Sequence, residues 1–154
     1  MIDEPKIVQR PAVKMAAIHV TVPREKIREV MGPGLQELTG ALEAQGVPPA
    51  GPWFTHHFEM RPDAFDFEIA VPVAADVKPA GRMKPGTLPA MRVAQTVYHG
   101  GYEGLPDGWM EFESWMSKNG HKMGAGLVEV YRVGPESGED ASKWQTELNR
   151  PLAE

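Results

Sequence analysis

Apolar side chains recur at helical spacing in two stretches of the chain, Leu35, Leu38 and Leu42 in one and Trp109, Phe112 and Met116 in the other. Separations of three and four residues place each set on one side of a helix. The spacing predicts one helix within residues 24–45, with its main part beginning near Pro33, and another over residues 105–119. Gly46 and Gly120 follow these stretches, as glycines commonly do at the C-terminal end of a helix.

Short alternating or continuous apolar runs, bounded by proline and glycine, predict the strands. These runs cover residues 6–22, 53–60, 65–74, 87–99, 127–133 and 144–152. Residues 76–86 are rich in proline and glycine and are expected to link two halves. The segments 61–64 and 134–142 are expected to be a turn and a polar loop.

The second half repeats the first. At an offset of 74 residues Gly46 matches Gly120 and His57 matches Tyr131, and after a loop longer by five residues Glu68 matches Glu147. We therefore expect one domain over residues 1–154 with an internal repeat, 6–76 and 86–153. The predicted fold class is α+β, with two pseudo-two-fold-related strand–helix–strand–strand modules, an antiparallel sheet, helices on one side and a central cleft.

The composition argues against several classes of function. The net charge is −5 with both signs interspersed, which argues against a nucleic-acid surface. Cysteine is absent, so thiol chemistry and thiolate metal sites are excluded. No apolar run approaches the ~20 residues that span a membrane, and the first ten residues do not resemble a signal peptide. We expect a cytoplasmic protein without a membrane partner, and the sequence leaves its oligomeric state open.

Glu147 stands among apolar neighbours in a predicted strand, and Glu68 has the same position in the first half. A buried carboxylate is costly unless it has a partner or a raised pKa, so an organic cation could supply the missing charge. The alternatives are a solvated glutamate on an edge strand and an ion pair with Arg150 or Arg92. Glu147 is the first candidate for a ligand's charge partner, and Glu68 is a secondary one.

Aromatic and histidine side chains are candidates for the wall of the same pocket, because ring faces attract delocalised cations. The set comprises Trp53, Phe54, His57, Tyr98, Tyr102, Trp109 and Tyr131. Ordinary core packing is the alternative for each, and a structural histidine is the alternative for His57. The five histidines do not have metal-ligand spacing, and phosphate-loop, dinucleotide and serine-nucleophile motifs are absent, so neither a metal nor a cofactor is predicted.

Residues 98–105, Tyr-His-Gly-Gly-Tyr-Glu-Gly-Leu, resemble the His-x-Gly-Pro-Tyr-x-x-Leu signature of the GyrI-like small-molecule-binding domains. Further similar motifs follow in the family's order at Trp109, Trp115, residues 119–120, 128–131 and 146–152, and residues 48–54 resemble a stretch of its first half. The resemblance covers nearly the whole chain. Gly101 replaces the proline of the signature, and the first half has Val-Thr-Val-Pro-Arg at 20–24 in place of a second copy.

The resemblance implies a bacterial ligand-sensing domain that binds large, flat, often cationic compounds between its halves, as in multidrug transcription regulators. Glu147 matches the family's buried acid, and the chain has no room for a helix-turn-helix domain, so we expect a stand-alone sensor or sequestering protein. The alternative is a small-molecule hydrolase with Glu147 as general base and Tyr131 or Tyr98 as proton donor. A module that inhibits a partner enzyme is a third possibility.

Overall fold

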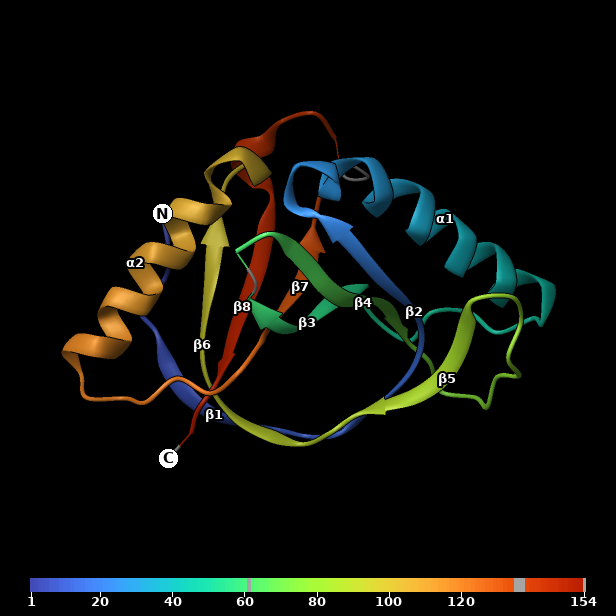
Figure 1. The fold of residues 1–154 in the computed structure, drawn as a ribbon, viewed down its shortest axis with the longest axis horizontal. Coiled ribbons are helices and arrows are strands. Elements are labelled where there is room, and N and C mark those ends of the chain that lie inside the picture. Colours follow the sequence, from blue (N-terminus) through green and yellow to red (C-terminus); the bar gives the residue numbers. More distant parts are fainter. Residues whose placement is uncertain (61, 135–137, 154) are drawn as a thin grey trace. The chain divides into compact units, whose positions relative to one another are not determined.

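The computed structural model describes residues 1–60, 62–134 and 138–153 (Figure 1). The chain forms two compact units. The first unit is Pro11–Ala90. The second unit consists of Met1–Arg10 and Met91–Glu154. All strand pairs within each unit are antiparallel, and each unit has one long helix, so the predicted α+β class is confirmed.

In the first unit the strand order is β3-β4-β2-β5. The strands are β2 (Val13–Pro23), β3 (Phe54–Met60), β4 (Ala64–Pro72) and β5 (Met83–Leu88). Helix α1 (Ile27–Ala44) follows the short 3-10 helix η1 (Arg24–Lys26) and packs on β4 and β2. Leu38 and Leu42 of α1 are buried against Ile18, Phe67 and Ile69 of the sheet.

In the second unit the strand order is β1-β6-β8-β7. The strands are β1 (Lys6–Arg10), β6 (Met91–His99), β7 (Leu127–Val133) and β8 (Gln145–Pro151). Helix α2 (Leu105–Lys118) follows the 3-10 helix η2 (Tyr102–Gly104), and a third 3-10 helix, η4 (Ala141–Lys143), precedes β8. Phe112 and Met116 of α2 are fully buried with Ala94 and Leu148 of the sheet.

The two helices end in the same way. Gly46 and Gly120 have φ of 69° and 76°. The amide of the next residue donates back across the last turn, from Val47 to the Leu42 carbonyl at 3.0 Å and from His121 to the Met116 carbonyl at 3.0 Å. This is the hydrogen-bond pattern of a Schellman C-cap, which favours glycine because of its positive φ. The glycine spacing therefore predicted both helix ends.

Three predicted boundaries are wrong. The strand predicted over 6–22 is two strands, β1 and β2, and Pro11 lies in the break between them. Helix α1 begins at Ile27 and continues through Pro33, because apolar residues of its first turns pack on the core and outweigh the local cost of proline. Strand β5 covers the end of the segment predicted as a linker, 76–86, and the start of the strand predicted over 87–99, the rest of which is β6; Pro85 is tolerated because β5 is an edge strand.

The loop predicted over 134–142 includes residues 135–137, and the turn predicted over 61–64 includes Arg61; these four positions lie outside the described residues. Among the helices of the described part, none is both long and apolar enough to cross a membrane.

Candidate functional site

Glu129 on β7 is a buried carboxylate, with 9% of its surface exposed. Its register partner on β8 is Leu148, which packs under α2, so the Glu129 side chain projects from the helix-covered face of the sheet. The neighbours Val128 and Val130 project from the other face. Sheet pairing therefore fixes the carboxylate between the strand and the helix.

Two neutral donors hold this carboxylate. The indole Nε1–H of Trp109, on α2, donates to Oε2 at 2.6 Å, and the hydroxyl of Tyr131, two residues further along β7, donates to Oε1 at 2.7 Å. Trp109 is 9% exposed and Tyr131 is 5% exposed. Within the described part of the chain, no cationic side chain forms a salt bridge with Glu129.

Burial raises the pKa of the Glu129 carboxyl, and the hydrogen bonds from Trp109 and Tyr131 act in the opposite direction. Burial has the larger effect. An isolated carboxylate loses solvation worth several kcal/mol when it leaves water, and two neutral hydrogen bonds replace only part of it. The arrangement therefore favours any cation, or any transferable proton, that can come next to Glu129.

Aromatic rings extend from the carboxylate toward the surface. The Tyr102 ring meets the edge of the Tyr131 ring at a centroid distance of 6.0 Å and lies 5.2 Å from the Trp144 ring. Tyr102 belongs to η2 and Trp144 follows η4, and both are half-buried. A register shift between Tyr131 and Val133, at the end of the β7–β8 pairing, lies directly beside Tyr131. Bulges of this kind redirect side chains next to functional sites.

Tyr98 supports the turn that leads into this site and does not touch the carboxylate. Its hydroxyl donates to the Gly101 carbonyl at 3.0 Å, and its ring lies against the backbone of α2 at Gly108. A Cβ at Gly108 would lie 2.6 Å from the Tyr98 ring, and a Cβ at Gly104 would lie 2.3 Å from its hydroxyl. Glycine at these positions lets α2 approach β6 closely enough for Trp109 to reach Glu129.

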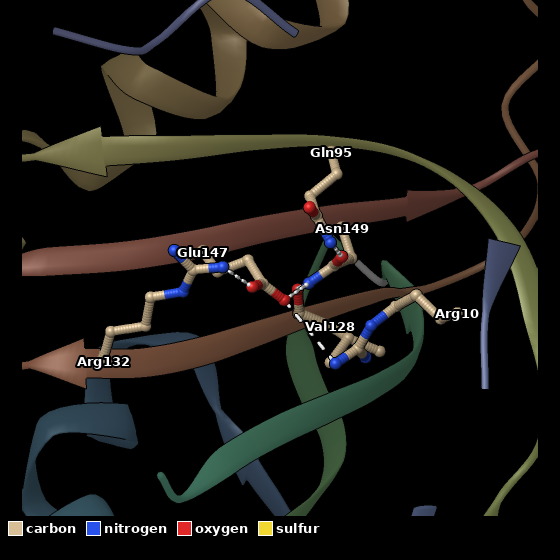
Figure 2. A network of polar contacts seen from close by, with 6 residues as sticks. All are labelled: Arg10, Gln95, Val128, Arg132, Glu147 and Asn149. Atoms are coloured by element: carbon tan, nitrogen blue, oxygen red, sulfur yellow. Dashed lines mark hydrogen bonds and ion pairs between the residues drawn. The ribbon is translucent and has the colours of Figure 1, made fainter. Parts of the chain in front are cut away.

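Glu147 on β8 is also buried, but its charge is already compensated (Figure 2). Arg132 donates to its Oε1, Asn149 donates to its Oε2 at 2.9 Å, and the Arg10 guanidinium lies 3.6 Å from Oε2. Gln95 completes the network by donating to the Asn149 side chain at 2.9 Å. The ion pair considered from the sequence exists, but with Arg132 and Arg10 in place of Arg150 or Arg92.

The two carboxylates occupy opposite faces of the sheet in the second unit. Glu147 pairs with Val130 of β7 and Val97 of β6, whereas Glu129 pairs with Leu148. Side chains alternate between faces along a strand, so Glu147 and Asn149 project away from α2. The structure therefore brings Trp109, Tyr131 and Tyr102 together with Glu129, and it does not bring them together with Glu147.

The candidates of the first unit are divided between the faces of its sheet. His57 pairs with Phe67 on the face that α1 covers, and Trp53 packs against the same core. Glu68 and Phe54 belong to the other face, where Glu68 lies in register with His19 and His56. Burial raises the pKa of Glu68, while the positive charge of His19 would lower it. These four residues do not form a single cluster.

The internal repeat shows what is special about the second unit. At the offset of 74, Gly34 and Gly108 are both close-packed helix glycines, and Leu38 and Leu42 correspond to Phe112 and Met116 in the two cores. The three members of the polar cluster have the counterparts Leu35, Thr55 and His57. Both β3 and β7 shift register just after the last of these positions, at His57 and Tyr131. The same scaffold thus holds an acid with two donors in the second unit only.

Sequence reasoning missed Glu129 and Trp144. Glu129 interrupts the apolar run 127–133 and alternates with Tyr131, which is the same signal that drew attention to Glu147. Its counterpart in the first half is Thr55, so a search for acids that recur in the repeat passes over it. The contact between Trp109 and Glu129 spans 20 residues of sequence and depends on tertiary packing.

Comparison with known proteins agrees with this architecture. The family model for the GyrI-like small molecule binding domain matches residues 3–153. No curated protein matches the sequence. Among solved structures, the C-terminal domain of EcmrR is 20% identical, with a TM-score of 0.85, and 98% of each chain is covered. The EcmrR chain in a complex with DNA is 21% identical, with a TM-score of 0.83; the match covers 97% of this chain and 57% of that one.

Two further similar structures are a complex with a bound ligand and a hydrolase. SAV2435, solved with bound tetraphenylphosphonium, is 13% identical, with a TM-score of 0.68, covering 97% of this chain and 94% of its own. A protein of Listeria innocua described as a hydrolase is 14% identical, with a TM-score of 0.68, covering 97% of this chain and 92% of its own. At these identities the likeness establishes the shared fold.

Proposed function

The chain belongs to the GyrI-like small-molecule-binding domains, and we propose that it binds hydrophobic, aromatic, cationic molecules with Glu129 as their charge partner. The observation that carries this proposal is the buried Glu129 carboxylate, held by Trp109 and Tyr131 and without a cationic partner among the described residues. An organic cation would supply the missing charge, and the Tyr102, Trp109 and Tyr131 rings would contact its apolar groups. Such a protein acts as a sensor or a sequestering protein.

This assignment moves the charge partner from Glu147 to Glu129. Glu147 already has two guanidinium groups and an amide, so an incoming cation would compete with Arg132 and Arg10. In the described part of the chain, the donors that a ligand would displace from Glu129 are neutral. The roles expected for Glu147, Glu68, Trp53, Phe54, His57 and Tyr98 stay predictions, as does the expectation that the chain binds no nucleic acid.

A ligand must open the site to reach Glu129, because Trp109 and Tyr131 cover the carboxylate. Tyr102 and Trp144 are the half-buried, outer part of the aromatic wall. Tyr102 belongs to the 3-10 helix η2 and Trp144 directly follows η4, and such short segments have fewer backbone hydrogen bonds than a helix or a sheet. Displacing these two rings leaves the helix and the strands in place. The binding of tetraphenylphosphonium by SAV2435 supports the choice of a bulky aromatic cation as the first ligand to test.

The test compares a cationic dye with a neutral dye of similar size in three proteins: the wild type, Glu129→Gln and Glu147→Gln. The titrations are followed by tryptophan fluorescence, to which Trp109 and Trp144 contribute together with Trp53 and Trp115. We expect Glu129→Gln to weaken binding of the cationic dye by about 1–3 kcal/mol, the range for hydrogen bonds to charged groups. Binding of the neutral dye should be nearly unchanged. Cation binding that fails in Glu147→Gln but survives in Glu129→Gln would return the role to Glu147.

Hydrolysis is the second candidate, and the same cluster favours it. A carboxylate with a raised pKa can serve as a general base near neutral pH, and Tyr131 lies 2.7 Å away as a proton donor. Two of the similar structures, both from Listeria innocua, are hydrolases by name. Turnover of an electrophilic small molecule that is lost in both Glu129→Gln and Tyr131→Phe, with binding retained, would establish it. Binding without turnover across a panel of electrophiles would leave the sensor role.

A further inference from the structure

His57 is the most deeply buried histidine of the described chain, with 6% of its surface exposed. It lies on β3 at the position that corresponds to Tyr131 on β7, and each residue immediately precedes a register shift. Its register partner is Phe67, in the core beneath α1. The first unit thus places a polar ring where the second unit places the tyrosine that holds Glu129.

Aromatic rings enclose His57 on two sides. The imidazole is stacked on Phe67 with a centroid distance of 4.8 Å and an interplanar angle of 12°, and it meets Phe65 edge to face at 5.4 Å. The Arg24 guanidinium lies 4.5 Å from the centroid of the Phe65 ring. This packing fixes the plane of the imidazole ring.

The Nδ1 atom of His57 is buried and has no hydrogen-bond partner among the described residues. Leaving a buried polar atom unsatisfied costs stability, and a phenylalanine would fill the same space without that cost. Burial, together with the nearby His56 and Arg24, lowers the pKa of His57 to about 4. At neutral pH the imidazole is therefore uncharged, and it has one N–H to donate and one nitrogen to accept with.

We propose that His57 is the centre of a second ligand subsite, in the first unit, which hydrogen-bonds an oxygen carried on a flat aromatic ring. Phe65, which is only partly buried, would contact the ligand's ring, and Nδ1, in the tautomer that carries its proton there, would donate to a carbonyl, hydroxyl or carboxylate oxygen. The positive charge of Arg24 favours an oxygen with partial or full negative charge. The subsite rests on the proposed ligand-binding function, but His57 would donate a hydrogen bond to an oxygen, whereas Glu129 would pair with a cation.

A matched pair of neutral probes isolates this contact from the charge of Glu129. Fluorene and 9-fluorenone share one flat ring system and differ by a single carbonyl. Equilibrium dialysis at pH 7.5 measures both in the wild type, in His57→Phe and in His56→Phe. The last variant is the control, because His56 neighbours His57 in sequence but projects from the other face of the sheet.

We expect the wild type and His56→Phe to bind fluorenone about three- to ten-fold more tightly than fluorene, the range of one net hydrogen bond. In His57→Phe the two probes should bind equally, and the melting temperature should not fall, since an unsatisfied nitrogen is removed. A carbonyl preference that survives in His57→Phe, or its absence from the wild type, would overturn the subsite.

Tetraphenylphosphonium, titrated into the wild type, His57→Phe and Glu129→Gln, separates this proposal from the proposed function. Cation binding that remains sensitive to Glu129→Gln while the carbonyl preference is absent overturns only the His57 subsite. A carbonyl preference that depends on His57 in a protein with no affinity for the cation supports the subsite and contradicts the role of Glu129.

Discussion

Glu129 and Glu147 lie on adjacent strands of one sheet, yet their side chains project from opposite faces, because Glu129 pairs with Leu148 and Glu147 with Val130. One carboxylate has two neutral donors, and the other has two guanidinium groups. We therefore expect the two acids to respond differently to substitution, pH and ligands.

The stability of the protein should depend on the ionisation of Glu129. Because burial raises its pKa in the folded state above the ordinary value of 4.5, the folded state holds its proton more tightly than the unfolded state. This group's contribution to stability is therefore largest below about pH 4.5 and is lost as pH rises through the raised pKa. Urea denaturation of the wild type and Glu129→Gln at several pH values measures it. As pH rises from 4.5, the free energy of unfolding of Glu129→Gln should increase relative to that of the wild type. A difference between the two proteins that does not depend on pH would contradict the burial of an ionisable Glu129.

Glu147→Gln should destabilise the fold at neutral pH. The substitution leaves the buried part of Arg10 without a counter-charge, while Arg132 is partly exposed and can turn to water. We expect a loss of about 2–4 kcal/mol, near the lower end of the range for breaking a buried ion pair. Urea denaturation at pH 7 measures it, with Arg132→Gln as the milder comparison. A loss below about 0.5 kcal/mol would show that the network resembles an exposed surface pair.

The helix glycines offer a matched test of packing. Gly108→Ala would bring a methyl group within 2.6 Å of Tyr98, and Gly34→Ala would bring one within 2.5 Å of Ile69. Gly108→Ala should cost about 1–3 kcal/mol, as overpacking does, and Gly34→Ala should cost less, because the terminal methyl group of Ile69 can move. Gly32→Ala and Gly40→Ala meet no atom within 4 Å and should stabilise α1 by up to about 1 kcal/mol. Thermal denaturation of the four variants measures both effects. If the changes in stability had the same sign in both pairs, the close packing at Gly108 and Gly34 would be contradicted.

Much of the architecture could be predicted from local pattern. The strand at 127–133 and the ends of both helices follow from alternation and glycine placement, which act over a few residues. The break at Pro11 and the pairing of β1 with β6 depend on partners more than 80 residues away, which local pattern does not specify. The start of α1 could not be predicted for a related reason. The packing of Ile27, Val30 and Met31 on the core outweighs the local preference of proline for the first turn of a helix.

The candidate site was predicted only in part, and the reason is geometric. Alternation shows that Glu147 and its neighbours take opposite faces, but it does not show which face the helix covers. Trp109, Tyr102 and Tyr131 were identified as aromatic candidates, and the structure places all three around a different acid. The repeat directed attention to Glu68 and Glu147, because they recur, whereas Glu129 is where the two halves differ.

Proton release on cation binding tests the role of Glu129 most directly. At pH 4.5, the ordinary pKa of the group, a carboxyl whose pKa is raised is more than half protonated, and a cation that pairs with the carboxylate must expel that proton. Calorimetric titration with tetraphenylphosphonium, in two buffers of different ionisation enthalpy, counts the protons released per ligand bound. We predict release in the wild type and Glu147→Gln, and none in Glu129→Gln. Tight binding without proton release in the wild type, or undiminished release in Glu129→Gln, would contradict the assignment of Glu129 as the charge partner.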